Sequence, residues 1–131
     1  MNGSKETKPT TFRDLLVWQK GMGLAIAACQ LAADFPQSER YGLGKLICRT
    51  AIGVPAGLAD GHSRHSPNEF LQAVSGASGS LSALETQIRI AVELQCCTAT
   101  AAAPLYEMID GGRRVLYGLR RSMQSRTETG R

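Results

Sequence analysis

The sequence predicts an all-α protein, an antiparallel up-down four-helix bundle, and two heptad seams carry this prediction. In the third predicted helix, apolar residues recur at alternating intervals of four and three: Phe70, Val74, Ala77, Leu81, Leu84, Ile88 and Ala91. The fourth predicted helix has a similar series: Leu105, Ile109, Gly112, Leu116, Leu119 and Met123. Helices with such seams pack nearly parallel. No segment shows the period-two alternation of a strand, so the sequence predicts helices and no strands.

The first predicted helix runs from about Phe12 to Phe35. Thr11 and Asp14 resemble a capping box at its start, and Pro36 ends it. One apolar stripe at helical spacing is expected to face the core: Phe12, Leu15, Leu16, Met22, Ile26, Cys29 and Ala33.

The second predicted helix begins after Ser38, a suitable N-cap, and stops near Gly61. Its expected core stripe is Leu43, Ile47, Ala51, Val54 and Leu58. Pro55 should bend this helix, because proline removes a backbone donor and clashes with the preceding turn.

The third helix has the clearest start, with Ser66 as N-cap, Pro67 at the first position and Glu69 at the third. The fourth is expected to begin between Thr100 and Pro104. Four helices joined by short loops make the antiparallel bundle the leading architecture.

A chain of 131 residues supports one domain with its own core. The expected division is a flexible segment over 1–10, the bundle over 11–123 and a flexible basic tail over 124–131. The polar first residues lack the apolar region of a secretory signal, and the stretch Leu24 to Ala33 is too short to span a bilayer. A cytoplasmic location follows by default.

The four cysteines, Cys29, Cys48, Cys96 and Cys97, form no Cys-x-x-Cys pair. This spacing suits neither a zinc cluster nor a disulfide framework. Cys29 is expected to behave as a small buried hydrophobe, and structural or incidental roles are expected for all four.

Charge is unevenly distributed along the chain. Residues 1–65 carry eight Lys/Arg against five Asp/Glu (+3), residues 66–110 one against five (−4), and residues 111–131 six against one (+5). The basic end is a possible handle for an acidic partner.

A series of short motifs occurs in a fixed order: Phe12, Leu15 and Trp18; Phe35-Pro36; Glu39-Arg40; Tyr41-Gly42-Leu43; Gly53 through Pro55 to Asp60-Gly61; Gly79-Ser80-Leu81; and Glu85-Thr86. This ordered set resembles the 23S rRNA intervening-sequence protein family over roughly residues 12 to 123. The chain departs from the family pattern by losing polar groups at Cys48, Gly53, Ala56, Gly57 and Ala83. Those departures bear on function rather than on fold.

The resemblance implies a cytosolic four-helix bundle that assembles into a ring, with pentamers expected, and no known enzymatic activity. Related proteins are accessory factors of diversity-generating retroelements, in which a basic pentameric barrel binds reverse transcriptase and RNA. Others are encoded within rRNA intervening sequences.

Several residues of the patterned region are expected to serve structure or assembly. Arg49, Asp60 and Glu85 are the charges expected inside or between bundles, and Arg49 is a possible partner for Glu85 because a buried charge needs one. Trp18 and Tyr41 are expected to pack rather than to stack on bases. Pro55 and Gly61 complete this set.

The candidate nucleic-acid contacts lie on the fourth predicted helix. Arg113, Arg114, Arg120 and Arg121 form two pairs one heptad apart, which puts them on one face, and Lys45 is a further candidate. Arginine suits phosphate because its planar fork donates two parallel hydrogen bonds. The competing interpretation is an ordinary solvated face.

No catalytic or metal-binding constellation is recognisable. His62 and His65 lack a third ligand nearby, and no serine has a base at a motif spacing. No cofactor, membrane role or small-molecule substrate is indicated. The leading hypothesis is a non-catalytic oligomer that binds RNA or a reverse-transcriptase-like nucleoprotein. The alternative is a structural or protein–protein adaptor.

Overall fold

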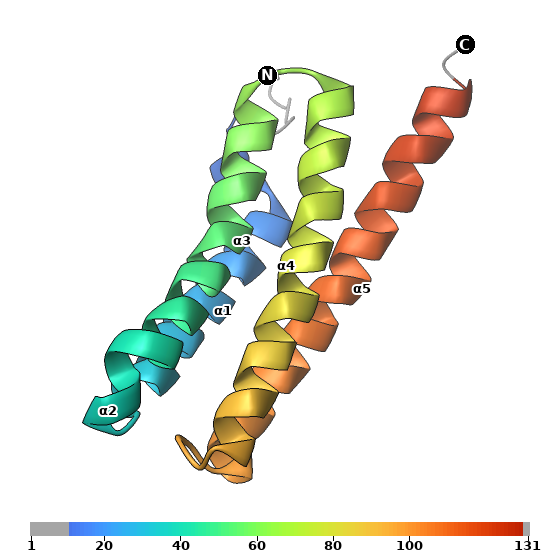
Figure 1. Cartoon of the computed structure of the whole chain (residues 1–131). Helices are drawn as coiled ribbons and strands as arrows, with labels where there is room; N and C mark the ends of the chain where they lie inside the picture. Colours follow the sequence, from blue (N-terminus) through green and yellow to red (C-terminus); the bar gives the residue numbers. More distant parts are fainter. Residues whose placement is uncertain (1–10, 130–131) are drawn as a thin grey trace, which may run out of the picture.

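The computed structural model describes residues 11–129, with side chains through 125. Four long helices make up the bundle: α1 (Leu16–Ala33), α3 (Lys45–Ser63), α4 (Pro67–Glu93) and α5 (Ala99–Thr129). A 3-10 turn (Phe12–Asp14) precedes α1, and α2 (Gln37–Glu39) with a π-helical turn (Arg40–Gly44) leads into α3. Successive long helices run in opposite directions (Figure 1). The predicted all-α antiparallel bundle is thus confirmed.

The four long helices occupy the corners of a square. α3 packs mainly on α1 and α4, whereas α5 packs on α4 and α1, so α3 and α5 lie diagonally opposite (Figure 1). α5 continues to Thr129, beyond the predicted end of the bundle at 123. The remainder of the predicted tail, 130–131, and the predicted flexible segment 1–10 lie outside the described residues.

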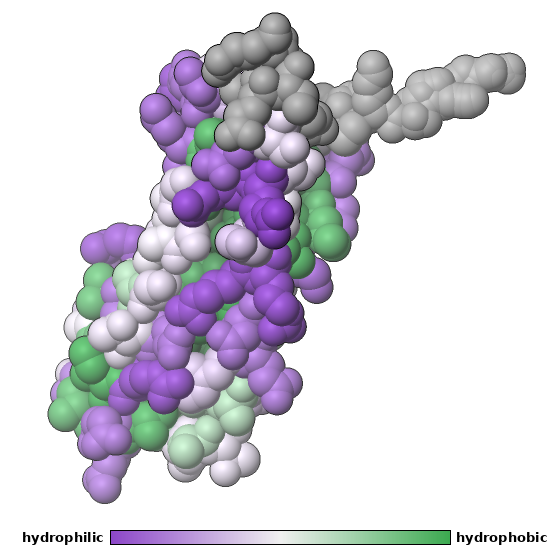
Figure 2. Space-filling view, turned by 90° about the vertical axis from the view of Figure 1, so that its right-hand side faces the viewer, coloured by the Kyte–Doolittle hydropathy of each residue, from purple (hydrophilic) through white to green (hydrophobic). Residues whose placement is uncertain are grey.

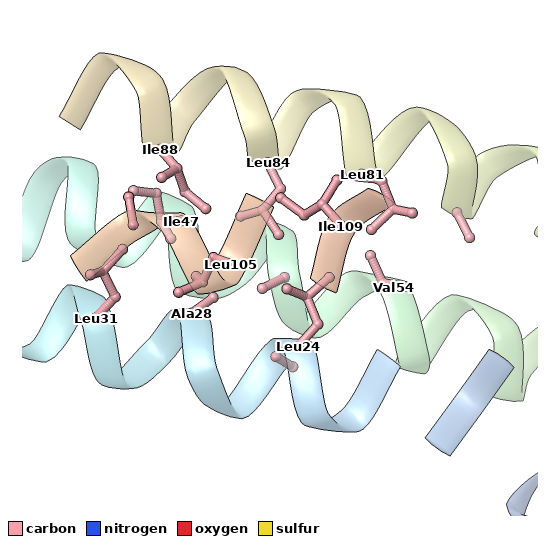
Figure 3. Packing of buried hydrophobic residues seen from close by; sticks show 14 of the residues in the cluster. Leu24, Ala28, Leu31, Ile47, Val54, Leu81, Leu84, Ile88, Leu105 and Ile109 are labelled. Carbon is pink, nitrogen blue, oxygen red and sulfur yellow. The ribbon is translucent and has the colours of Figure 1, made fainter. Parts of the chain in front are cut away.

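The core lies along the two predicted seams. Leu81, Leu84 and Ile88 of α4 are 1%, 0% and 0% exposed, and they meet Ile109 of α5 and Ile47 of α3 in the middle of the bundle (Figure 3). Fully burying a leucine or isoleucine contributes about 1.5–3 kcal/mol. The predicted α3 stripe is confirmed at Ile47, Ala51, Val54 and Leu58, which are buried. Its first member, Leu43, lies on the π-helical turn and is half-buried.

On α1 the predicted core stripe is wrong. Leu16, Met22 and Ile26 are 55%, 39% and 52% exposed. The face that enters the core is instead smaller: Val17, Gly21, Leu24, Ala25, Ala28, Leu31 and Ala32. Close helix approach explains the choice, because a Cβ added at Gly21 would lie 3.3 Å from the Pro55 side chain. A small-residue face lets α1 come closer to α3 than the larger stripe would allow.

The helix termini follow local chemistry. The Ser66 hydroxyl accepts a hydrogen bond from the Glu69 amide at 3.3 Å, with Pro67 as the first helical residue, which confirms the predicted start of α4. Ser38 is not the predicted N-cap, because it lies inside α2, which begins at Gln37. α5 begins at Ala99, where Thr98 accepts from the amide of Ala101 at 3.0 Å.

α3 is one helix across Pro55. The proline ring is buried against α1, and its neighbour there is Gly21. Near the C-terminal end of α3, Gly61 approaches the Ala73 side chain of α4 so closely that an added Cβ would overlap it. A bend at Pro55 remains a prediction.

Among the described helices, none combines the length and apolar character needed to cross a lipid bilayer.

Candidate nucleic-acid interface

Arg113, one of the four arginines predicted to contact phosphate, turns toward α4. Its guanidinium donates to Glu85 at 2.7 Å and to Asp110 at 2.9 Å, with a longer contact to the Ser82 hydroxyl at 3.4 Å. The side chain is 34% exposed and that of Glu85 is 24% exposed. Arg113 therefore joins α4 to α5, and its charge is already met by two carboxylates.

Glu85 is the acidic centre of this contact. The hydrogen bond from Arg113, followed by the one from Arg89, lowers the pKa of the Glu85 carboxyl, while partial burial opposes the shift. Arg89 donates to Glu85 at 2.8 Å and also lies 4.4 Å above the ring of Tyr106. The structure thus gives Glu85 partners from α4 and α5.

The predicted partner of Glu85, Arg49, does not reach it. Arg49 is exposed on α3, and Arg113 is the arginine that pairs with Glu85 instead. The helix arrangement gives the reason, because Glu85 lies on the side of α4 that faces α5. Arg113 lies next to the α5 seam, and Glu85 lies next to the α4 seam. This matching position is the sequence signal that could have identified the pair.

Three arginines on α5 remain exposed: Arg114, Arg120 and Arg121. Within the part of the chain with described side chains, none of the three forms an ion pair, and Arg121 lies 5.8 Å over the ring of Tyr117. Figure 2, which looks onto the α5 side of the bundle, shows hydrophilic residues gathered along much of that surface. We call Arg114, Arg120 and Arg121 the α5 arginines.

A groove between α1 and α5 adds a further cation. Its volume is about 480 Å³, and Lys20 and Arg114 line it together with Glu107. Gly23 and Gly111 leave the walls open because neither carries a side chain. Lys20 and Arg114 thus bring two cations together from α1 and α5, although Glu107 offsets part of the charge in the groove.

Arg121 lies one heptad from Arg114 on the same face of α5, whereas Arg120 lies one heptad from Arg113, nearer α4. We call Lys20 and the α5 arginines the basic surface.

Lys45 lies elsewhere. It is exposed on α3, the helix diagonal to α5, so the structure does not bring it together with the α5 arginines.

The predicted packing residues divide into two groups. Trp18 is half-buried and meets Phe12 edge-to-face at 5.3 Å, and Pro55 and Gly61 are buried at helix contacts. Tyr41, expected to pack, is 70% exposed because it lies on the π-helical turn. Asp60 is exposed and pairs with Arg64 at 3.3 Å within its own chain.

The cysteines differ from expectation. Cys29 of α1 and Cys48 of α3 form a disulfide, so Cys29 is a crosslink and not a lone buried hydrophobe. Spacing rules missed it because the pairing depends on how α1 faces α3. Cys96 and Cys97 are free, and burial raises the pKa of both thiols, which disfavours the reactive thiolate.

Across the described residues, no cluster of three or more His, Cys, Asp or Glu could hold a metal ion. His62 instead packs edge-to-face against Phe70 at 5.5 Å.

Fold and site together define a small all-α bundle with a basic face and a network of ion pairs inside one helix contact. The profile of the 23S rRNA-intervening sequence protein family matches residues 13–118. The chain therefore belongs to this family of small helical proteins, which have no known catalytic role. Among curated proteins, none matches the sequence.

Proposed function

We propose that this protein is a non-catalytic, oligomeric RNA-binding bundle that contacts phosphates through the α5 arginines and Lys20. The observation that carries the proposal is the contrast within α5, where Arg113 is neutralised by carboxylates and the α5 arginines are not. Arginines without an internal carboxylate partner can give both guanidinium hydrogen bonds to phosphate.

Assembly would strengthen this interaction. In a homo-oligomeric ring, with a pentamer as the favoured form, one basic face per copy becomes a band of repeated phosphate sites. Several weak contacts on one RNA then act together and raise the overall affinity. A cytoplasmic RNA, or a nucleoprotein such as a reverse transcriptase with its RNA, is the expected partner.

Recognition would be by charge and shape. Sequence-specific reading of unpaired bases relies on aromatic platforms. Among the described side chains of α5, Tyr117 is the exposed aromatic, at 62%, and Arg121 already lies over its ring. Weak sequence preference is therefore expected.

The test is a fluorescence titration of a labelled structured RNA with the protein and two triple variants. Arg114→Ala/Arg120→Ala/Arg121→Ala should weaken binding at least tenfold. The matched control Arg13→Ala/Arg40→Ala/Arg64→Ala removes the same charge away from α5 and should change binding much less. Equal losses in both variants would mean that only net charge matters, which contradicts a defined interface.

The alternative function is a structural or protein–protein adaptor whose basic face meets an acidic protein. In that case RNA affinity would be weak for the parent protein and unchanged in either triple variant. A proximity-labelling experiment would then recover acidic proteins whose capture depends on the α5 arginines.

A further inference from the structure

An apolar groove lies on the outer side of the bundle between α1 and α3. Its volume is about 440 Å³, and no charged side chain lines it. The lining residues are Met22, Ala25, Ile26, Cys29, Gln30, Ala33, Ile52 and Pro55. Met22, Ile26 and Ile52 are 39%, 52% and 49% exposed. We call this the α1–α3 groove. A contiguous exposed apolar surface of this kind is typical of an interaction site.

Two cations lie beside the α1–α3 groove. Arg49 precedes the groove residue Ile52 by three positions, and Lys45 precedes Cys48, the disulfide partner of Cys29, by three. Residues three apart are neighbours on a helix surface. Both cations are exposed, and neither forms an ion pair within residues 11–125. An occupant of the groove should therefore be apolar with an acidic flank.

The same chain carries such a surface at the end of α4. Ile90 and Leu94 are one turn apart and 45% and 61% exposed, and the exposed Glu93 precedes Leu94. We call Ile90, Glu93 and Leu94 the α4 ridge. It has two unpartnered apolar side chains and one carboxylate that forms no ion pair among the described side chains. The ridge thus has the chemistry that the groove requires.

The ridge also lies at a suitable height. Ile88 is level with Ala28, and Ile47 lies between Ala28 and Leu31 (Figure 3). Ile90 and Leu94 follow Ile88 toward the C-terminal end of α4, which is the end of the bundle where Leu31 lies. In copies with parallel bundle axes, Ile90 and Leu94 would meet the Ala33 end of the α1–α3 groove. That end is also where Lys45, two residues before Ile47, lies, so Glu93 would approach a cation.

We propose that the α4 ridge of one copy docks in the α1–α3 groove of the next, with Glu93 facing Lys45. This inference rests on the assembly proposed above and specifies its contact. The contact is heterologous because groove and ridge are different surfaces, and heterologous contacts repeat to form a closed ring when the rotation closes. Neither surface includes the α5 arginines, so assembly leaves the basic surface accessible.

The test measures mass by sedimentation velocity for two variants and their mixture. The groove variant, Ile26→Lys/Ile52→Lys, retains a ridge, and the ridge variant, Ile90→Lys/Leu94→Lys, retains a groove. Each alone should be a monomer. An equimolar mixture should form a one-to-one dimer, because one intact groove meets one intact ridge. Circular dichroism checks that both fold, as expected for changes at exposed positions.

Three results would overturn the inference. If the parent protein is a monomer, the α1–α3 groove does not bind a second copy. If either variant keeps the parental mass, the substituted surface is not part of the contact. If the mixture stays monomeric, groove and ridge do not bind each other. Charge exchange gives an independent check: Lys45→Glu should weaken assembly at least tenfold, and adding Glu93→Lys should restore it. Because these readouts use no RNA, they separate failure of the interface from failure of the proposed RNA binding.

Discussion

On α4 the apolar residues of the heptad seam point into the core, whereas on α1 a stripe of similar spacing points away from it. Leu84 and Ile88 are fully buried, but Met22 and Ile26 are 39% and 52% exposed. The two stripes have comparable residues and the same helical period. Periodicity therefore identifies a face that avoids water without saying whether this chain or another surface covers it.

The difference arises from residue size. α1 has a second apolar face, made largely of alanine and glycine with Leu24 and Leu31, and only this face allows contact at the Gly21–Pro55 crossing. α4 has one continuous heptad seam, with Leu81, Leu84 and Ile88 at its centre, and this seam enters the core. On α1 the face of smaller residues enters the closely packed core, and the face of larger residues stays exposed.

The largest predicted effect contrasts these two stripes directly. Leu84→Ala should lower the free energy of unfolding by about 3 kcal/mol, because it leaves a cavity at a fully buried site. Ile26→Ala should change that free energy by less than about 0.5 kcal/mol in a monomeric background such as the ridge variant, because the side chain is exposed there. Urea denaturation measures both, and comparable losses would show that the α1 stripe is part of the core.

The second prediction concerns the crosslink beside the exposed stripe. Cys29 and Cys48 are 19 residues apart, and closing a loop of this size stabilises by about 3 kcal/mol in the chain-entropy model. Cys48→Ser should therefore lower the unfolding free energy by about 2–3 kcal/mol under oxidising conditions. The control is the parent protein in a thiol reductant, which should match the variant. An unchanged urea midpoint in both would contradict a stabilising crosslink.

The third prediction compares two glycines of α3 that differ only in what they face. Gly61→Ala would overlap Ala73, so it should destabilise by about 2 kcal/mol, and adding Ala73→Gly should recover most of the loss. Gly57→Ala meets nothing within 4 Å and should stabilise by about 0.5–1 kcal/mol. Thermal unfolding distinguishes the two, and a neutral Gly61→Ala would mean that α3 and α4 separate easily.

The smallest effect concerns the polar edge of the α4 seam. Folding lowers the pKa of the Glu85 carboxyl. The ion pairs of Glu85 therefore stabilise the fold fully above the unfolded-state pKa, near 4.3. This stabilisation is lost as pH falls through the folded-state pKa. Glu85→Gln should cost about 1 kcal/mol at pH 7 and progressively less below about pH 4. A stability difference that stays constant from pH 7 to pH 2 would contradict the ion-pair role.

The sequence was sufficient for the helices with one clear apolar face. It predicted the Ser66 start of α4 and the buried positions Leu81, Ile88 and Ile109, because local capping and heptad spacing determine them. It failed at features that depend on how helices face one another. The Arg113–Glu85 pair and the Cys29–Cys48 disulfide both join different helices. The seam-flanking positions of Arg113 and Glu85 make that pair possible, but only the packing of α4 on α5 selects it over Arg49, and no local pattern encodes the disulfide.

For the candidate site, sequence spacing grouped Arg113 with Arg114, although adjacent residues on a helix point about 100° apart. Arg113 consequently faces α4, while Arg114 lines the groove with Lys20. Helical geometry could have separated them, but only the position of Glu85 shows which arginine is neutralised.

The salt dependence of RNA binding tests the proposed interface most directly. Each lost phosphate contact on the structured RNA should reduce the slope of log K against log salt by about 0.7 in single-stranded parts and about 0.9 in duplex parts. The variant Arg114→Ala/Arg120→Ala/Arg121→Ala should therefore show a slope shallower than that of the parent protein by about 2–3, whereas Arg113→Ala should leave the slope unchanged. Identical slopes for the parent and the triple variant would contradict phosphate binding by the α5 arginines.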